Sequence, residues 1–153
     1  MPPDLRARVV FDNSLRARGA GDVLVLDAQG NVILDSGSLV PRKAHFADRD
    51  YFLAFREQGQ QGLFFGKPVP SRVTGLNILP ISRGYYNADG SFAGVVVGAI
   101  RLSYFNELFG SLNLGPNSGI NMFRQDGVVI SRFPYGDADV DKTIAGSPNL
   151  LRF

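Results

Sequence analysis

The chain has 153 residues, of which 44% are hydrophobic and 20% charged, a composition typical of folded globular proteins rather than disordered chains. Its 16 basic and 14 acidic residues leave a net charge of only +2, so we expect no nucleic-acid partner. Cysteine is absent, which excludes disulfides, thiolate metal sites and thiol nucleophiles. The longest apolar run, residues 92–100, is far shorter than the roughly 20 residues of a membrane helix.

The first half of the chain predicts a helix, a hairpin and a second helix. Residues 4–18 have apolar side chains near one helical stripe, and the pattern breaks at the glycines that follow. Residues 22–36 contain two β-branched runs around Gly30, which can supply the positive φ of a hairpin turn. After an irregular stretch, residues 47–59 predict a helix with Asp48 as N-cap and Asp50 in the first turn.

Three strands are predicted next, over residues 62–69, 75–86 and 91–102. The last two are joined by a turn that contains Asp89 and Gly90, a strong hairpin signal. Tight antiparallel links with helices between them indicate an α+β domain. We therefore expect a PAS-like five-stranded antiparallel sheet with flanking helices, in which the segments before the third strand wall a cavity.

The pattern then starts again. Residues 103–115 predict a helix and residues 119–133 a hairpin, and "LDAQGNVI" and "FRQDGVVI" share the ending Gly-x-Val-Ile. A repeated order of helix and hairpin is the signature of a repeated module. We expect residues 1–102 to form an N-terminal helix plus one complete module, and residues 103–153 to form a linker helix and part of a second. The abrupt ends favour a piece of a longer protein.

Two arginines, Arg72 and Arg83, flank the apolar part of the predicted strand at 75–86. Strand alternation places Arg83 and Tyr85 on the face that also carries Leu79 and Ile81. An inward-facing arginine must be paired, either with a protein carboxylate or with a ligand such as a small acid. Asp48 or Asp50 could serve as the protein partner of Arg72 and Arg83, and both kinds of pairing could occur together. On the next strand, Gly94 and Gly98 could leave a dimple or mark a bulge.

Catalysis has no visible apparatus in the sequence. His45, the only histidine, is expected at the surface, and "DADVD" at residues 137–141 lacks the glycine and glutamate of a calcium loop. We therefore expect no metal site and no cofactor. Two alternatives stay open: a hydrolase without a linear motif, and a cytosolic PAS domain that holds haem or flavin.

Four stretches carry a family resemblance: "ADRDYFLAF", "GKPVPSRVTGLNILPISR", "NADGSFAGVVVGAI" and "GINMFRQDGVVISRFP". In this order and spacing they resemble the tandem PAS-like sensor region, called double Cache or PDC, of bacterial membrane receptors. The branch attached to histidine kinases and diguanylate cyclases is the most similar.

The resemblance implies a periplasmic or other extracytoplasmic domain of an inner-membrane protein, flanked by membrane helices and homodimeric in the full-length receptor. It implies that a small molecule binds in the first module, while this fragment is not itself an enzyme. A histidine kinase is the expected output, with a diguanylate cyclase or a chemoreceptor as alternatives. The amino-acid-binding branch carries a tryptophan that this chain lacks, so a carboxylate ligand is favoured. The expected ligand-binding residues are Asp50, Tyr51, Arg72, Ser82, Arg83 and Tyr85.

Overall fold

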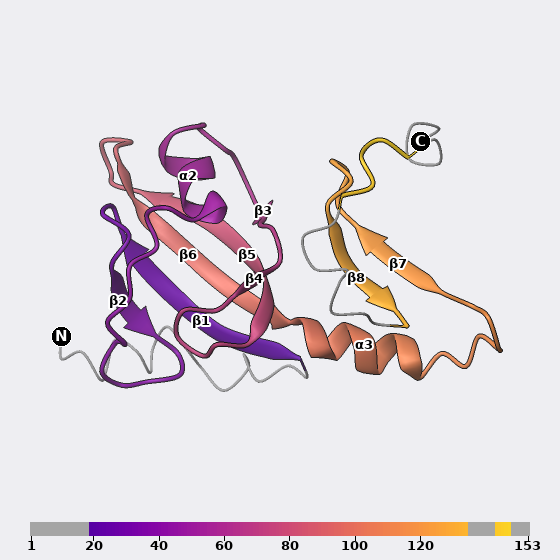
Figure 1. The fold of residues 1–153 in the computed structure, drawn as a ribbon. Coiled ribbons are helices and arrows are strands. Elements are labelled where there is room, and N and C mark those ends of the chain that lie inside the picture. The colour runs from indigo at the N-terminus through magenta and orange to yellow at the C-terminus, as the bar shows by residue number, and fades with distance from the viewer. Residues whose placement is uncertain (1–18, 135–142, 148–153) are drawn as a thin grey trace.

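The computed structural model describes residues 19–134 and 143–147. Its centre is a six-stranded antiparallel sheet in the order β2-β1-β6-β5-β3, with β4 also paired to β5 (Figure 1). The strands are β1 (Ala20–Asp27), β2 (Val32–Asp35), β3 (Phe64–Phe65), β4 (Val69–Pro70), β5 (Asn77–Tyr86) and β6 (Phe92–Arg101). The predicted α+β class is confirmed. The predicted strand at 62–69 is two short strands, β3 and β4, which pair with different parts of β5.

The two hairpin turns predicted for the main sheet are present. Between β1 and β2, Asp27 Oδ1 accepts hydrogen bonds from the backbone N–H groups of Gln29 and Asn31, and Gly30 has a φ of +86°. Between β5 and β6, Asp89 accepts from Ser91 N–H, and Gly90 has a φ of +83°. In both turns an aspartate satisfies backbone donors and a glycine takes the left-handed conformation, which is the chemistry that the sequence signals.

The helix α2 (Asp50–Arg56) covers one face of the sheet (Figure 1). Phe52 is fully buried and meets Phe92 of β6 edge-to-face, and Phe55 does the same with Phe64 of β3. The predicted N-cap is wrong: Arg49 occupies the cap position, and no side chain caps the helix. Asp50 does lie in the first turn, as expected.

The chain continues from β6 directly into α3 (Leu102–Gly110) and then into the hairpin of β7 (Ile120–Phe123) and β8 (Val129–Phe133). We call α3, β7 and β8 together the hairpin unit. In Figure 1 it lies beside the main sheet, with α3 as the link. A buried apolar cluster joins the two parts, because Leu79 of β5 packs with Leu102, Phe105 and Ile130 of the hairpin unit.

Two sequence predictions fall outside the described residues, namely the helix at 4–18 and the acidic stretch at 137–141. None of the helices in the described part of the chain is long and apolar enough to cross a membrane.

Candidate functional site: a charged cavity over the sheet

A cavity of about 230 Å³ lies between the main sheet and the loops beside α2. Its floor includes Leu24 of β1, Ile78 of β5 and Val97 of β6. Its walls come from residues around Phe46 and from the loop 69–76, which begins with the short strand β4. Pockets for drug-sized ligands hold about 300–1,000 Å³. This cavity is smaller, so its volume fits a small metabolite. Its lining is mostly apolar and includes the charged residues Asp22, Arg49, Arg72 and Arg101.

Arg49 is the polar group that stands out in this wall. One end of its guanidinium is used, since Nη2 donates to the carbonyl of Pro70 at 3.0 Å. Its Nε is buried and has no hydrogen-bond partner among the described residues. A buried donor without a partner costs about 1–3 kcal/mol. Arg49 is not among the residues that the sequence predicts for the site, because its neighbours Asp48 and Asp50 indicate the start of a helix.

Arg72 borders the cavity and is bound to the protein itself. Its guanidinium donates to both oxygens of Asp48 at 2.6 Å and to the carbonyl of His45 at 2.5 Å. It also lies over the ring of Phe46, 5.8 Å from the ring centre. These hydrogen bonds lower the pKa of the Asp48 carboxyl to about 2. The ion pair with Asp48 that the sequence allowed is therefore present, and it holds the loop 69–76 against the segment before α2.

Tyr51 supplies another part of the wall, and Asp50 and Ser82 hold it in place. Tyr51 is almost fully buried, and this burial raises the pKa of its hydroxyl. The Asp50 carboxylate accepts hydrogen bonds from the N–H groups of Tyr51 and Lys67, both at 2.8 Å. The buried Ser82 hydroxyl donates to the carbonyl of Tyr51 at 3.2 Å. Asp50 and Ser82 therefore anchor the wall without lining the cavity themselves.

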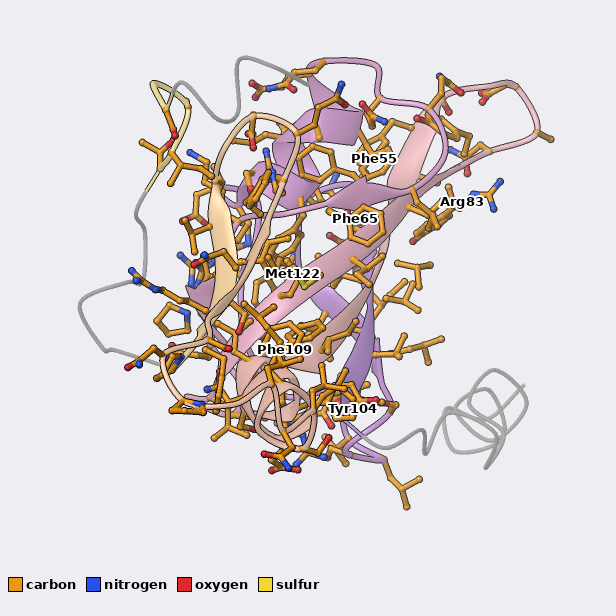
Figure 2. The ribbon with its side chains drawn as sticks, turned by 90° about the vertical axis from the view of Figure 1, so that its right-hand side faces the viewer. Phe55, Phe65, Arg83, Tyr104, Phe109 and Met122 are labelled. Carbon is orange, nitrogen blue, oxygen red and sulfur yellow. The ribbon has the colours of Figure 1, made fainter. Side chains whose placement is uncertain are left out.

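The expectation that Arg83 faces inward is wrong. The alternation along β5 is as predicted, but the even-numbered residues face α2 and the cavity: Ile78 lines the cavity, Ser82 bonds to α2, and Gly84 lies under Phe55. Arg83 is exposed, and Figure 2 shows its side chain extending outward from the sheet. Tyr85 also lies outside the cavity, where its hydroxyl donates to the carbonyl of Leu26 at 3.0 Å.

The two glycines of β6 behave differently. The backbone of Gly98 borders the cavity, but the side-chain position of Gly98 is on the other face of the sheet, where it is paired with Val23 and Ile81 and a Cβ would lie 3.8 Å from Val23 Cγ2. Gly94 does not leave a dimple, because the Leu26 carbonyl and the Tyr85 hydroxyl fill the space that a side chain would take.

The carboxylate of Asp22 at the cavity belongs to a three-residue ionic network. Arg42 donates to Asp22 Oδ2 at 2.5 Å and to both oxygens of Asp35 at 2.6 and 2.7 Å. The Asp35 side chain is fully buried, which by itself would raise its pKa, but the hydrogen bonds from Arg42 lower the pKa below its usual value. This network fixes the loop after β2 to the end of the sheet next to the cavity.

No group of three or more histidine, aspartate or glutamate side chains within residues 19–134 and 143–147 is arranged to hold a metal ion. His45 is exposed, as expected, and its Nδ1 lies 3.2 Å from the side-chain oxygen of Asn31.

The fold is an antiparallel sheet with a helix on one face and a small cavity beneath the flanking loops. This architecture defines a PAS-like ligand-binding domain. The Cache domain model matches residues 9–150. The chain therefore belongs to the Cache domain family. Solved structures that share its fold include extracellular and ligand-binding domains of histidine kinases and chemoreceptors. No curated protein matches the chain.

Solved structures show the same fold. The extracellular domain assigned to the histidine kinase rpHK1S-Z16 is 27% identical with a TM-score of 0.78, and the match covers 98% of this chain and 60% of that one. The ligand-binding domain of the Pseudomonas aeruginosa chemoreceptor PctC, solved with GABA, is 20% identical with a TM-score of 0.65 and coverages of 93% and 61%. The sensor domain of the V. cholerae histidine kinase DctB is 23% identical with a TM-score of 0.55 and coverages of 87% and 49%.

Proposed function

We propose that this chain is the extracytoplasmic sensing part of a transmembrane receptor and that it binds a small carboxylate in the cavity lined by Arg49, Tyr51 and Arg72. The observation that carries the proposal is Arg49, whose guanidinium lines a mostly apolar cavity and whose buried Nε has no partner among the described residues. A ligand carboxylate is the natural acceptor for a guanidinium N–H, and such charge-assisted hydrogen bonds are roughly twice as strong as neutral ones. The PctC domain was solved with GABA, which also carries a carboxylate.

Each part of the wall has a role in this proposal. Arg49 binds the carboxylate, Tyr51 and the apolar floor contact the rest of the molecule, and Arg72 keeps the loop 69–76 closed over it through Asp48. Because Arg72 already has a carboxylate partner, its contribution to the ligand is mainly a positive field. Asp50 and Ser82 act indirectly by fixing Tyr51. Arg83 and Tyr85 are not part of the proposed site.

The complete receptor is proposed from the comparisons. A histidine kinase is the output that we favour, because the neighbour with 27% identity and a TM-score of 0.78 is assigned to one. A chemoreceptor or a diguanylate cyclase is the alternative. The chain spans only about 60% of that neighbour, so the proposal includes a longer protein with membrane helices, a periplasmic location and a homodimer. Residues 1–102 would form the ligand-binding module and residues 103–153 the start of the second.

The test is a thermal-shift titration with acetate, pyruvate, succinate, L-alanine and GABA, each beside its amide analogue. At a concentration of 100 times its dissociation constant, a ligand stabilises the fold by about 2.7 kcal/mol. We expect at least one carboxylate to raise the Tm of the wild-type chain while its amide does not. Arg49→Gln should abolish this shift, because it removes the charge and the Nε donor. Arg56→Gln, which removes an exposed arginine at the other end of α2, should keep it.

Two results would contradict the proposal. One is that no carboxylate stabilises the wild-type chain more than its amide. The other is that Arg49→Gln, with an unchanged circular dichroism spectrum, is stabilised as strongly as Arg56→Gln.

A further inference from the structure

Arg124 connects the hairpin unit to the part of the main sheet that carries the cavity. It lies in the turn between β7 and β8, and its Nη1 donates to the carbonyl of Phe65 in β3 at 2.7 Å. Its guanidinium lies over the ring of Phe64, 5.7 Å from the centre, and Phe64 packs edge-to-face on Phe55 of α2. The same Nη1 is 3.9 Å from Asp50 Oδ2. One side chain of the hairpin unit thus contacts β3 and the first turn of α2.

The turn itself orients this arginine. Asp126 accepts from Arg124 Nε at 3.1 Å and from Nη2 at 2.5 Å, which occupies one edge of the guanidinium. The edge that carries Nη1 is therefore directed at Phe65 and Asp50. The Arg124 side chain is only 20% exposed and that of Asp50 30%, so solvent screens their attraction less than it would an open surface pair. An arginine already fixed by one carboxylate loses little further side-chain entropy when it meets a second.

Asp50 stands between this arginine and the cavity. In the sequence it lies between Arg49 and Tyr51, which both line the cavity. Its Oδ1 accepts from the N–H of Tyr51, and its Oδ2, the oxygen near Arg124, accepts from the N–H of Lys67. A displacement of the first turn of α2 must move this carboxylate relative to Arg124.

The other contact between the two parts is of a different kind. The cluster of Leu79, Leu102, Phe105 and Ile130 is apolar and buried, and none of these four residues lines the cavity. Figure 2 shows Phe109 and Met122 of the hairpin unit on the same side of the sheet as Phe65. The contacts of Arg124 are polar and partly exposed, and its ion pair with Asp50 is long at 3.9 Å, so a movement of Asp50 towards Arg124 would turn this ion pair into a direct charge-assisted hydrogen bond.

We infer that Arg124 couples occupancy of the cavity to the position of the hairpin unit, with Asp50 as the intermediate. The inference rests on the proposed function. A molecule bound by Arg49 and Tyr51 would shift the first turn of α2, and the Asp50 carboxylate would move towards or away from Arg124. Coupling of this kind is reciprocal: if the cavity acts on the hairpin unit, a change at Arg124 must act on the cavity wall.

Reciprocity allows a test that needs no ligand. In the full 153-residue chain, amide hydrogen exchange of Tyr51 and Lys67 reports the position of the Asp50 carboxylate, because both amides donate to it. In addition, 3-fluorotyrosine labelling reports the Tyr51 ring, and its fluorine signal is assigned from Tyr51→Phe. The variants are Arg124→Gln, Asp50→Asn, the double variant, and Arg56→Gln as a charge-matched control. Global stability is measured for each by urea unfolding.

We expect Arg124→Gln to speed exchange of both amides by at least about fivefold beyond the change in global stability, at the lower end of typical coupling. The Tyr51 fluorine signal should move by more than its linewidth, and Arg56→Gln should change neither. In the double variant, Arg124→Gln should add nothing to the effect of Asp50→Asn, because both changes break the same link. Arg124→Lys, which keeps the charge, should restore part of the protection.

The inference is overturned if Arg124→Gln matches Arg56→Gln, if its effect adds fully to that of Asp50→Asn, or if the amides respond while the Tyr51 ring does not. In the last case Arg124 only fastens the hairpin unit to the helix. These outcomes are separate from the carboxylate titration. A chain that binds no carboxylate but shows the exchange effect refutes the proposed function alone, and a chain that binds without the exchange effect refutes the coupling alone.

Discussion

At the scale of single residues, Asp48 and Arg72 show how an exposed ion pair can hold a cavity closed. Two parallel hydrogen bonds of 2.6 Å join them, although the Asp48 side chain is 61% exposed. Exposed pairs contribute only about 0–1 kcal/mol to stability. The importance of this pair is therefore positional: it connects the loop 69–76 to the segment before α2, and Arg49 lies in that same segment.

The ion pair of Asp48 and Arg72 predicts how the stability of the fold changes at low pH. Arg72 lowers the pKa of Asp48 from 3.8 to about 2, so the stability that Asp48 contributes is fully present above pH 3.8 and is lost as the pH falls through 2. Asp48→Asn should flatten the fall of the unfolding free energy in this window without abolishing it, because the pKa values of Asp35 and Asp126 are lowered too. Urea unfolding at several pH values measures this.

Arg72→Gln provides the control for that measurement, because it removes the other member of the same pair. It should flatten the same pH window to the same extent as Asp48→Asn. An unchanged slope in Asp48→Asn would show that the ion pair does not exist in solution.

At the scale of elements, strand β6 carries one glycine at which a side chain would clash and one at which a side chain has room. Gly94 has a φ of +152°, and a Cβ there would lie 2.0 Å from the Leu26 carbonyl oxygen and 2.7 Å from the Tyr85 hydroxyl. At Gly98 the nearest atoms would be 3.8 Å away, which is ordinary contact. The first glycine is required by the close approach of β1 to β6, whereas the second leaves space.

The two glycines therefore form a matched pair of variants. Gly94→Ala should destabilise the fold by about 1–3 kcal/mol or more, because the backbone is strained and two neighbours must shift. Gly98→Ala should be neutral or stabilise by up to about 1 kcal/mol, since alanine restricts the unfolded chain more than glycine does. Equilibrium unfolding in urea compares them. Equal stabilities of the two variants would contradict the backbone geometry described here.

At the scale of the whole molecule, the hairpin unit depends on the main sheet. Among the described residues, β7 and β8 form a two-stranded sheet of their own, and such a hairpin is marginally stable by itself in water. Its attachment consists mainly of the cluster around Leu79 and the contacts of Arg124. The six-stranded sheet, by contrast, has a core with fully buried residues such as Phe52 and Leu26.

This difference predicts two levels of protection in hydrogen exchange. Amides of β7 and β8 should exchange by local opening at a lower free energy than those at the centre of β5 and β6, which should exchange only by global unfolding. Leu79→Ala should lower the protection of the hairpin further, because it removes a buried contact with Ile130. Equal protection in both sheets would mean that they unfold as one unit.

The hairpins of the main sheet and the two faces of β5 are the parts of the fold that the sequence predicts. Turn chemistry at Gly30 and Gly90 located the two hairpins of the main sheet, and alternation along β5 assigned its residues to two faces correctly. The alternation does not indicate which face of β5 points towards the cavity, because both faces carry apolar residues: Ile78 lines the cavity and Leu79 packs on α3. The expectation that Arg83 faces the cavity is therefore wrong. Arg49 could not be predicted, because a residue before a helix follows no period and its surroundings depend on the path of the loop 69–76.

The order of the sheet has a consequence for how the chain folds. The inner strand β1 pairs with β6 from Ala20, which lies beside Ile100, to Asp27, so no local segment can complete the sheet. At a synthesis rate of about 5–20 residues per second, roughly 4–15 seconds pass between the synthesis of β1 and that of β6. During that interval one edge of β1 offers unpaired backbone groups to any other extended chain. The nascent protein therefore passes through an aggregation-prone stage that the finished sheet conceals.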